Sequence, residues 1–433
     1  MTTFVPHPRV LRSPRHRDWP RYPEPANDEA ATLPEVADVV IVGAGPAGLA
    51  VAAALWHLGI PDVVVLDRTG KPVSRFFERV DRLEQRVLRS PYEHHPGVEG
   101  YRDCELRDFA RLHWSLLTPI ERREIRMSQA GHRSVVPVDV FEAYCHHTAA
   151  IHGVTGRLWR RDVSSVEPNG ERVTVRGADF RIDAGQVVLC LGEERRDAPG
   201  NWWTGTRPEE IGYWDETVPA GAEREVVVGA GLTAAHLIHN ALDRGARVEW
   251  VMRGENERYQ CSDVNASFFR AEGRARFDSF RAPVPWADRL ALMGRQRRAS
   301  VMFEFRPLFE AAQADGRLTV HRGTDIGAVH AKGVELTDGR LVSGDHTTLA
   351  LGTVPSIGGG LMSDELVGAR DGWPDLDERT LAYQRAPRVF AAGAAACMVL
   401  GPAGRNIDGH RVATARIAAT IAARVHEKAA VHV

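Results

Sequence analysis

The sequence predicts an α/β protein of two domains, each built on a parallel sheet. Three observations predict this fold. Apolar, strand-like runs that end at a glycine alternate with helical stretches, which is typical of parallel strands joined by crossover helices. The stretch "DVVIVGAGPAGLA" at 38–50 is nearly repeated by "EVVVGAGLTAAHL" at 225–237. Finally, 433 residues are too many for one compact core and fit two domains.

The composition excludes several classes of protein. With 43% apolar and 26% charged residues the chain has a globular composition, and its net charge of -2 provides no field that would attract nucleic acid or an anionic membrane. No apolar run reaches the roughly 18 to 20 residues that span a bilayer. The five cysteines are scattered and contain no C-x-x-C pair, which argues against a metal site and favours a reducing compartment. We therefore expect a cytoplasmic protein that binds neither membrane, nucleic acid nor metal.

The first glycine turn has the spacing of a Rossmann-like dinucleotide-binding unit. A strand in 38–43 runs into Gly43, Gly45 and Gly48, and an alanine-rich helix follows at once. The three glycines would provide a tight turn, close approach of the backbone to a pyrophosphate, and close contact between helix and sheet. The next strand ends in Asp67, 19 residues beyond Gly48, where a carboxylate would accept hydrogen bonds from ribose hydroxyls.

The second glycine turn repeats this plan with Gly229, Gly231 and Ala234. The following strand, 247–252, leads into Arg253 where the first unit has Asp67. An arginine can pair with a 2′-phosphate that a carboxylate would repel, so this unit predicts NADPH rather than NADH. The alternative is a surface arginine without this role.

His236 and His239 lie three apart on the helix that follows the second turn. With no carboxylate or cysteine cluster nearby in sequence, we expect them on an ordinary solvated helix rather than in a metal site.

Two dinucleotides on one chain predict FAD on the first unit and NADPH on the second, with hydride passing between them. FAD is assigned to the first unit because its N-terminal position and the late segment resemble those of two-dinucleotide flavoproteins. In that late segment a strand ends at Gly393, and Asn406 and Ile407 open a long helix. The N-terminus of this helix would face the flavin pyrimidine ring and stabilise its reduced, anionic form.

The domain organisation follows from this resemblance, which implies two Rossmann-like dinucleotide-binding domains with the NADPH-binding domain inserted in the FAD-binding domain. Two hairpins are expected at 155–183, around an Asn-Gly turn, and at 328–345, around an Asp-Gly turn. The Arg- and Pro-rich N-terminus predicts an extended arm that lies on the surface or is partly disordered, the alternative being a partner-binding segment. The expected parts are the arm at 1–35, the FAD-binding domain at 36–198, the NADPH-binding domain at 199–345, and the second part of the FAD-binding domain at 346–433.

Taken together, these residues resemble the class B flavin monooxygenases, and among them the N-hydroxylating enzymes that act on amino-acid or diamine nitrogen. The segment "DHTTLALGTVPS" at 345–356 is similar to the family's pattern of an aspartate, three residues and L-A-T-G-Y, with departures at Leu351 and Thr353. The segment at 262–277 resembles the family's insertion in which an asparagine contacts substrate, so the resemblance assigns that role to Asn265.

The segment "QRVLRSPYEHHPG" at 85–97 occupies the position that passes the reactive face of the flavin in the resembling enzymes. Arg89, His94 and His95 are therefore candidates that line the active site, and a histidine with a pKa near neutrality can exchange a proton with the substrate. The alternative is a solvated loop in which Ser90 and Pro91 only make a turn.

Some family features are missing. The F-x-G-x-x-x-H signature of the dimethylaniline-type and Baeyer–Villiger branches does not occur, and Ala394 stands where disulfide-reductase relatives carry an acidic residue. The resemblance implies a monooxygenase that forms a C4a-hydroperoxyflavin and transfers one oxygen from O₂ to a small polar substrate, most simply by N-hydroxylation of an amine or amino acid in specialised metabolism. The alternatives are an NAD(P)H-dependent reductase that feeds a quinone or protein acceptor, and a non-catalytic flavin sensor. A homo-oligomer is possible.

Overall fold

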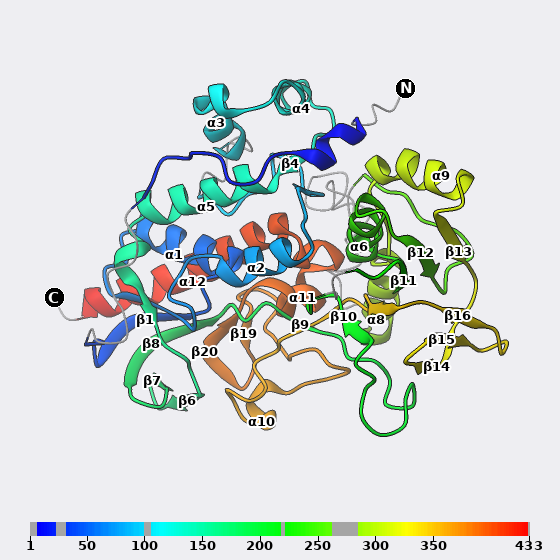
Figure 1. Cartoon of the computed structure of the whole chain (residues 1–433). Coiled ribbons are helices and arrows are strands. Elements are labelled where there is room, and N and C mark those ends of the chain that lie inside the picture. Colours follow the sequence, from blue (N-terminus) through cyan, green and yellow to red (C-terminus); the bar gives the residue numbers. More distant parts are fainter. Residues whose placement is uncertain (1–6, 23–31, 99–104, 218–220, 262–284, 432–433) are drawn as a thin grey trace.

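A computed structural model describes residues 7–22, 32–98, 105–217, 221–261 and 285–431. It contains two α/β domains side by side, and the chain crosses from the first to the second and back again (Figure 1). Within the described ranges, no helix combines the length and apolar character needed to cross a bilayer.

The first domain is built on a mainly parallel sheet. Strand β1 pairs in parallel with β2 on one side and with β8 on the other, and β20 pairs in parallel with β8. The late strand β20 therefore completes a sheet that the first part of the chain begins, which confirms that the second domain is an insertion. The strands in sheet order are β19 (Ala382–Tyr383), β20 (Ala386–Ala391), β8 (Arg181–Leu189), β1 (Val36–Val42), β2 (Val63–Asp67) and β5 (Leu158–Arg160).

Helices α1 (Pro46–His57), α5 (Val138–Ile151) and α12 (Ile407–Val431) lie next to one another over this sheet (Figure 1). Helix α1 is buried from Ala47 to Leu55 because small alanines let it pack closely against both the sheet and its helical neighbours. Around this core lie the shorter elements β3 (Val87–Leu88), β4 (Val136–Pro137), α2 (Ser74–Arg82), α3 (Glu105–Leu112), α4 (Pro119–Gln129), α10 (Asp364–Val367) and α11 (Cys397–Leu400).

The second domain has three layers, because its central strands bury both faces. Val227 and Trp250 face helices α6 (Leu232–Asp243) and α9 (Arg306–Ala314), whereas Val226 and Val251 face the small antiparallel sheet of β14, β15 and β16. This alternation is the two-residue period of a strand. The parallel sheet runs in the order β10 (Ile211–Tyr213), β17 (His346–Leu349), β11 (Arg224–Val228), β12 (Arg247–Val251) and β13 (Leu318–His321). Helix α8 (Trp286–Gln296) precedes α9 in the chain.

Both hairpins expected from sequence are present. Strands β6 (Ser165–Asn169) and β7 (Arg172–Arg176) pair antiparallel around an Asn-Gly turn, in which Gly170 has φ +58°. Strands β15 (Gly333–Leu336) and β16 (Leu341–Ser343) pair antiparallel around an Asp-Gly turn, and β14 (Ile326–His330) adds a third strand.

The expected boundary of the second domain at residue 345 is four residues too early. Strand β17, at 346–349, pairs with β10 and β11 inside the second sheet. Asp345 anchors its start, because its Oδ2 accepts the backbone N–H groups of Glu223 (3.0 Å) and Arg224 (2.9 Å). The chain returns to the first domain only at β18 (Thr353–Pro355), which pairs antiparallel with the outgoing strand β9 (Glu193–Arg195).

The expectation of an extended surface arm holds only in part. Residues 8–12 form a short 3-10 helix, η1 (Pro8–Arg12), whose Val10 and Leu11 are buried in the core of the second domain. Apolar residues within an Arg- and Pro-rich segment find a hydrophobic partner in the tertiary structure, which composition alone does not show.

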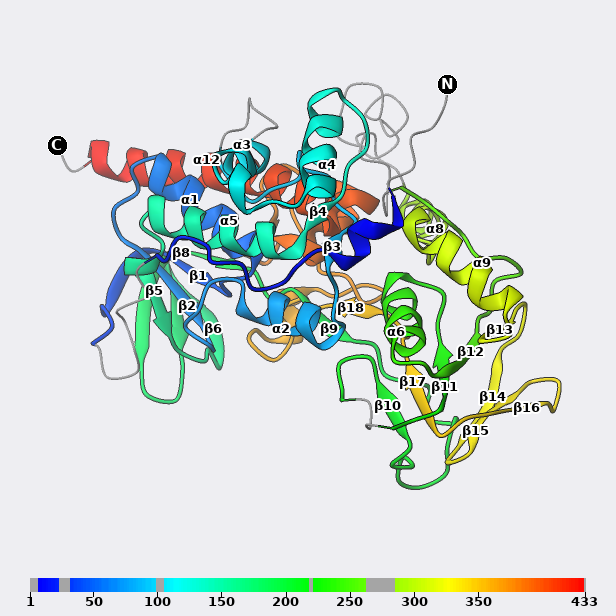
Figure 2. The same cartoon turned by 45° about the horizontal axis from the view of Figure 1, so that its top comes forward.

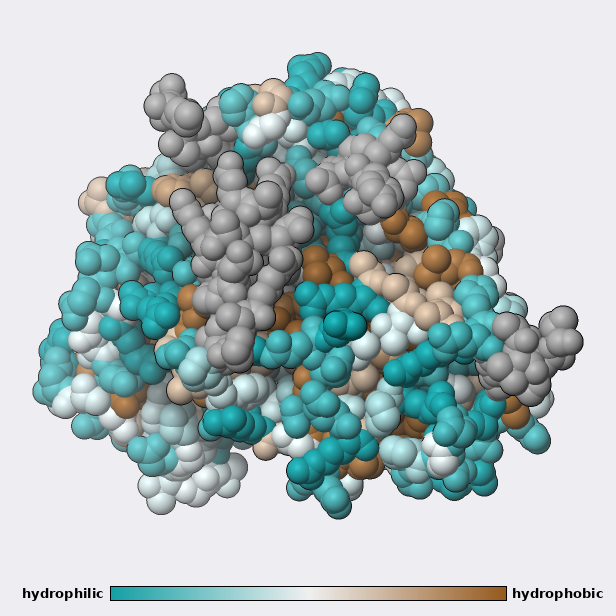
Figure 3. Space-filling view, turned by 180° about the vertical axis from the view of Figure 1, so that it is seen from behind, coloured by the Kyte–Doolittle hydropathy of each residue, from teal (hydrophilic) through white to brown (hydrophobic). Residues whose placement is uncertain are grey.

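The surface seen from behind is mostly hydrophilic, with apolar residues in small groups between polar ones (Figure 3). This distribution is ordinary for a globular protein.

Candidate active site

In the first glycine turn, close packing requires glycine at two positions, and the third position is open to a ligand. Gly43 has φ +99°, and a Cβ there would lie 2.5 Å from the carbonyl oxygen of Cys190. A Cβ on Gly48 would lie 1.9 Å from the carbonyl oxygen of Gly43, so the helix can approach the strand only because this residue is glycine. At Gly45, the N-cap of α1, no described atom lies within 4 Å of the Cβ position. The N-cap position of α1 is thus open, and the unpaired N–H groups of a first helical turn are those that bind a pyrophosphate.

Asp67 lies at the carboxyl end of β2 beside this turn. Its Oδ2 accepts the backbone N–H of Ala44 at 2.9 Å, and its Oδ1 accepts the backbone N–H of Thr69 at 2.8 Å and the Thr69 hydroxyl at 2.6 Å. A carboxylate has about four acceptor positions, so this fixed group keeps capacity for a ribose hydroxyl.

The second glycine turn also has one glycine that packing requires and one that is open. Gly229 has φ +141°, and a Cβ there would lie 2.4 Å from the carbonyl oxygen of Ala350. Gly231 is the N-cap of α6 and, among the residues that the structure describes, nothing lies within 4 Å of its Cβ position. Ala234 is fully buried where helix and sheet meet. The Trp250 indole N–H donates to the Gly229 carbonyl at 2.6 Å, which holds the turn from the neighbouring strand.

Arg253 follows the buried Met252 at the end of β12 and is exposed. Its side chain makes no hydrogen bond or ion pair within the described part of the chain. A guanidinium that has no partner in the described ranges is available for a phosphate at this place.

The late segment closes the first dinucleotide unit. Gly393, with φ +76°, follows β20, and the position of its Cβ would lie 3.6 Å from the Cβ of Ala47 in α1 and 3.8 Å from Nε2 of His410 in α12. The carbonyl of Asn406 accepts the His410 backbone N–H at 3.2 Å as α12 begins, and Ile407 is buried. The amino ends of α1 and α12, both positive ends of helix dipoles, therefore approach one another at the carboxyl edge of the sheet.

His410 is a residue that the sequence did not single out. Its Nδ1 is buried and has no hydrogen-bond partner among the described residues. Burial lowers the pKa of His410 to about 4, so the imidazole is neutral at physiological pH. A buried polar atom without a partner among the described residues, on a histidine whose ring also lies next to Gly393, fits a site that a cofactor completes.

The three predicted residues of the segment between β3 and α3 are all buried, so the alternative of a solvated loop is wrong. We call residues 89–97 the reaction-face loop. Arg89 donates from Nη1 to the Ser300 hydroxyl at 2.9 Å and from Nη2 to the Ser300 carbonyl at 2.5 Å. It therefore connects the loop to the second domain.

His94 and His95 have different surroundings. His94 Nε2 lies 4.0 Å from Oδ2 of Asp408, in the first turn of α12. His95 is fully buried, and its Nδ1 accepts the Gly97 backbone N–H at 3.2 Å and lies 3.2 Å from the Tyr144 hydroxyl. The structure thus brings His94 to the amino end of α12 and places His95 in a supporting network.

Asn265, the candidate for substrate contact, lies outside the described residues.

An ionic cluster connects β9 and β18, the strands by which the chain leaves and re-enters the first domain, to the start of α12. The Glu193 carboxylate of β9 bonds to the Arg405 guanidinium and the Thr353 hydroxyl, and Arg405 Nη2 donates to that hydroxyl at 2.7 Å. Burial by itself would raise the pKa of Glu193, but the hydrogen bonds and charge of Arg405 outweigh it and lower the pKa. Glu193 lies 160 positions from Thr353 and 212 from Arg405, so no local pattern reveals these contacts.

His236 and His239 are buried rather than solvated, which corrects the sequence-based expectation. The rings of His236 and Phe305 make an edge contact with centroids 5.0 Å apart, and burial lowers the pKa of His236 to about 3. Within the described part of the chain, no cluster of three metal-binding side chains occurs.

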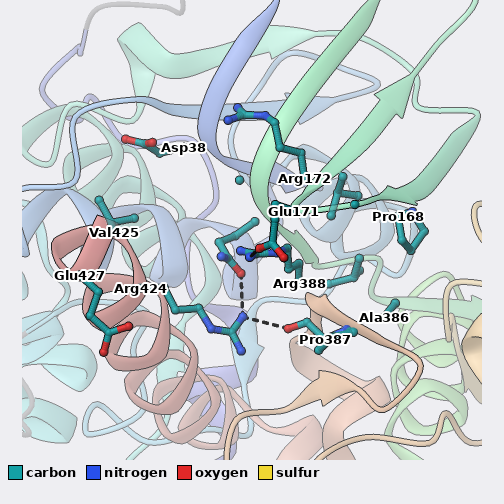
Figure 4. A pocket seen from close by; sticks show the side chains of 15 residues that line it. Asp38, Pro168, Glu171, Arg172, Ala386, Pro387, Arg388, Arg424, Val425 and Glu427 are labelled. Atoms are coloured by element: carbon teal, nitrogen blue, oxygen red, sulfur yellow. Dashed lines mark hydrogen bonds and ion pairs between the residues drawn. The ribbon is translucent and has the colours of Figure 1, made fainter. Parts of the chain in front are cut away.

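A cavity of about 820 Å³ lies at the opposite edge of the first sheet. Asp38, Pro387 and Arg424 line it, and Arg424 donates to the Pro387 carbonyl (Figure 4). Asp38 and Pro387 belong to the amino ends of β1 and β20, whereas the glycine turn follows the carboxyl end of β1. Ligands of open parallel sheets bind outside the carboxyl ends, so this cavity is not the dinucleotide site.

Comparisons with known proteins agree with this geometry. Residues 36–190 match the family of the FAD binding domain. A comparison with curated protein sequences finds no match. The reduced form of ornithine hydroxylase from Pseudomonas aeruginosa has a TM-score of 0.70 at 17% identity, covering 90% of this chain and 100% of that one.

Two further solved structures have the same arrangement. Ornithine N-hydroxylase from Kutzneria sp. 744, with reduced FAD, NADP+ and L-ornithine, has a TM-score of 0.71 at 16% identity over 90% of this chain and 99% of that one. Bacillithiol disulfide reductase from Bacillus cereus has a lower TM-score, 0.59, at 17% identity over 90% and 99%. The expected fold and the assignment of FAD to the first unit are confirmed: the chain carries an FAD-binding domain and has the fold of the N-hydroxylating flavin monooxygenases.

Proposed function

We propose that this protein is an FAD- and NADPH-dependent monooxygenase that transfers one atom of O₂ to a small polar substrate, by N-hydroxylation of an amine or amino acid. The observation that carries this proposal is the pair of glycine turns, each with an open N-cap glycine, on two sheets that are joined by the crossing strands β9 and β18. The ornithine hydroxylases with the same fold support the substrate class.

The chain's own residues hold the two nucleotides. The amino end of α1 and Asp67 bind FAD through its pyrophosphate and ribose, and α12 adds a second positive helix end. Gly231 and the amino end of α6 bind the pyrophosphate of NADPH, and Arg253 pairs with its 2′-phosphate. When bound, FAD would supply the redox chemistry by which the two electrons of NADPH reduce O₂, with one oxygen atom going to the substrate and the other to water.

The reaction-face loop excludes water and handles the proton. Its Arg89, His94 and His95 are 8%, 6% and 0% exposed, so these side chains exclude water, and His94 lies at the amino end of α12. We assign to His94, beside Asp408, the uptake of the proton that the substrate nitrogen releases. Asn265 is proposed to contact the substrate.

The alternative function is an NAD(P)H-dependent reductase that passes electrons to a quinone or a protein. The fold shared with a bacillithiol disulfide reductase favours it, although the TM-score is lower than those of the hydroxylases. The sequence also lacks the C-x-x-C pair expected of a disulfide-reductase branch.

Isotope labelling distinguishes the two functions. The purified protein is supplied with FAD, NADPH and ¹⁸O₂ and is offered a panel of amines and amino acids. A monooxygenase gives an N-hydroxylated product with one ¹⁸O atom per NADPH consumed, and its NADPH turnover stops without oxygen. Full anaerobic turnover with a quinone, and unlabelled substrates throughout the panel, would establish the reductase instead. Cytoplasmic location and a possible homo-oligomer also stay predictions, and gel filtration tests the second.

A further inference from the structure

The N-terminal segment 7–22, which we call the N-terminal strap, crosses from one domain to the other. At its start, Val10 and Leu11 are 1% and 3% exposed in the core of the second domain, in one cluster with Ile238 of α6 and Phe305. From there the strap runs along α5 over the first domain, as the dark blue trace in Figure 2 shows. One continuous segment is therefore anchored in both domains.

Two arginines attach the strap to the first domain. Arg15 pairs with Asp81 of α2 and, at 3.0 Å, with Glu142 of α5. Arg17 pairs with Glu121 of α4 and, at 2.8 Å, with Asp139 of α5. Further along, Trp19 stacks on Phe109 of α3 with centroids 5.8 Å apart, and the Tyr22 hydroxyl lies 3.0 Å from Nδ1 of His147.

The Arg17 pairs are the most deeply buried of these contacts. The side chains of Arg17 and Glu121 are 7% and 1% exposed, and that of Asp139 is 5% exposed. A buried ion pair costs desolvation when it forms, but the loss of one partner leaves uncompensated buried charge. Without the charge of Arg17, the buried carboxylates of Glu121 in α4 and Asp139 in α5 would be uncompensated, so Arg17 stabilises both helices in their positions.

Helix α4 passes this constraint to the reaction-face loop. Glu121 also closes a capping box with Thr118 at the start of α4. About two turns further along α4, the Ser128 hydroxyl donates to the Glu93 carboxylate in the loop at 2.7 Å. Tyr92 of the loop is fully buried, and burial together with the charges of Glu121 and Glu124 holds its pKa well above the usual range, so the carboxylates of α4 lie close to the loop.

We infer that the N-terminal strap is a positioning element, in which Arg17 holds α4 and the reaction-face loop while Val10 and Leu11 hold the second domain against the first. This inference rests on the proposed function, because it concerns the alignment of the nicotinamide with the flavin. Hydride transfer requires that alignment, and a misplacement of about 1 Å can cost about a hundredfold in rate. FAD binding requires only the first glycine turn and its neighbours.

The test is the variant Arg17→Met, which keeps an apolar stem but removes the charge. Its matched control is Arg9→Met, because Arg9 belongs to the same segment, is exposed, and makes no side-chain hydrogen bond or ion pair within the described ranges. Three quantities are measured: the FAD bound per protein, the rate constant of anaerobic flavin reduction at saturating NADPH, and the NADPH concentration that gives half of that rate.

We expect Arg17→Met to bind FAD like the wild type and to be reduced about tenfold more slowly or worse, with little change in the half-saturating NADPH concentration. Arg9→Met behaves like the wild type, and Arg17→Lys recovers part of the rate because it restores the charge. If Arg17→Met does not fold, Arg17→Lys provides the comparison, since Lys lacks the bidentate geometry and is expected to be reduced more slowly than the wild type.

Reduction of Arg17→Met at the wild-type rate overturns the inference, as does equal slowing in Arg9→Met or loss of FAD from Arg17→Met. If Arg17→Lys is the only variant that folds, its reduction at the wild-type rate also overturns the inference. A wild-type protein that binds FAD but is not reduced by NADPH contradicts the proposed function instead.

Discussion

Serine substitutions at the two open glycines are expected to weaken the binding of one cofactor each. Gly45 and Gly231 are the N-caps of α1 and α6, with φ −65° and −97° and ψ −177° and −176°, all values that any residue adopts. Serine is a favourable N-cap, so neither substitution lowers the stability of the fold. The new side chain instead occupies the space through which a pyrophosphate reaches the helix N-terminus.

The expected loss follows from the contacts at that N-terminus. A hydrogen bond to a charged group contributes about 1.5 to 3 kcal/mol. Displacing a pyrophosphate from two backbone N–H groups therefore costs about 3 kcal/mol or more, which is about a hundredfold in Kd. Gly45→Ser weakens FAD binding by this factor, whereas Gly231→Ser keeps its FAD and weakens NADPH binding.

The assay is calorimetric titration of FAD into apoprotein and of NADP+ into the FAD-bound protein, with thermal unfolding of both apoproteins. Gly48→Ala is the packing control, because its Cβ would lie 1.9 Å from the Gly43 carbonyl oxygen. This overpacking lowers the free energy of unfolding by about 1 to 3 kcal/mol even without cofactor. Unchanged FAD affinity in Gly45→Ser would refute the assignment of the first turn, and joint loss of both cofactors in either serine variant would refute their separation.

Three further predictions concern single side chains. Arg253→Ala weakens NADPH binding by about 2 kcal/mol, roughly thirtyfold, and leaves NADH binding unchanged, because only NADPH offers a 2′-phosphate. The check is flavin reduction at varied concentrations of each nucleotide, and equal losses of affinity for both contradict the prediction. His410→Leu is expected to weaken FAD binding about tenfold, or about 1.4 kcal/mol, because it removes a buried Nδ1 that has no partner among the described residues. His426→Leu, exposed on the same helix, leaves FAD binding unchanged, and similar results for the two variants in a titration would remove His410 from the site. Burial raises the pKa of Glu124 to about 7, above its ordinary 4.5, so its stabilising contribution is complete below pH 4.5 and is lost as the pH rises through about 7. The free energy of unfolding of Glu124→Gln, measured in urea, should therefore rise relative to that of the wild type by up to about 3 kcal/mol between pH 4.5 and pH 8. A difference between the two proteins that does not depend on pH would contradict this.

Local patterns were sufficient for much of the fold. The positive φ of Gly43 and Gly229 and the close approach at Gly48 are demands of a strand, a turn and a helix that follow one another in the chain, so the spacing of glycines reveals them. The Asn-Gly and Asp-Gly turns predicted both hairpins for the same reason.

The placement of Arg89 shows where such patterns stop. The sequence put this residue on the loop beside the reactive face, but its bond to Ser300, 211 positions away, depends on how the two domains pack. The same holds for strand β17: the strand-like run "TTLALG" that ends at Gly352 is visible in sequence, whereas the place of β17 beside β10 and β11 is decided by pairing with distant strands.

The sequence by itself thus determined the two dinucleotide turns and their order, because glycine conformation and hydrophobic period are properties of neighbouring residues. Only the tertiary structure decided that His410 approaches Gly393 and that Arg17 meets Glu121 and Asp139. Burial and ion pairing depend on which distant surfaces come together, and the energy of a charge or an imidazole nitrogen is set by those surroundings rather than by its place in the chain.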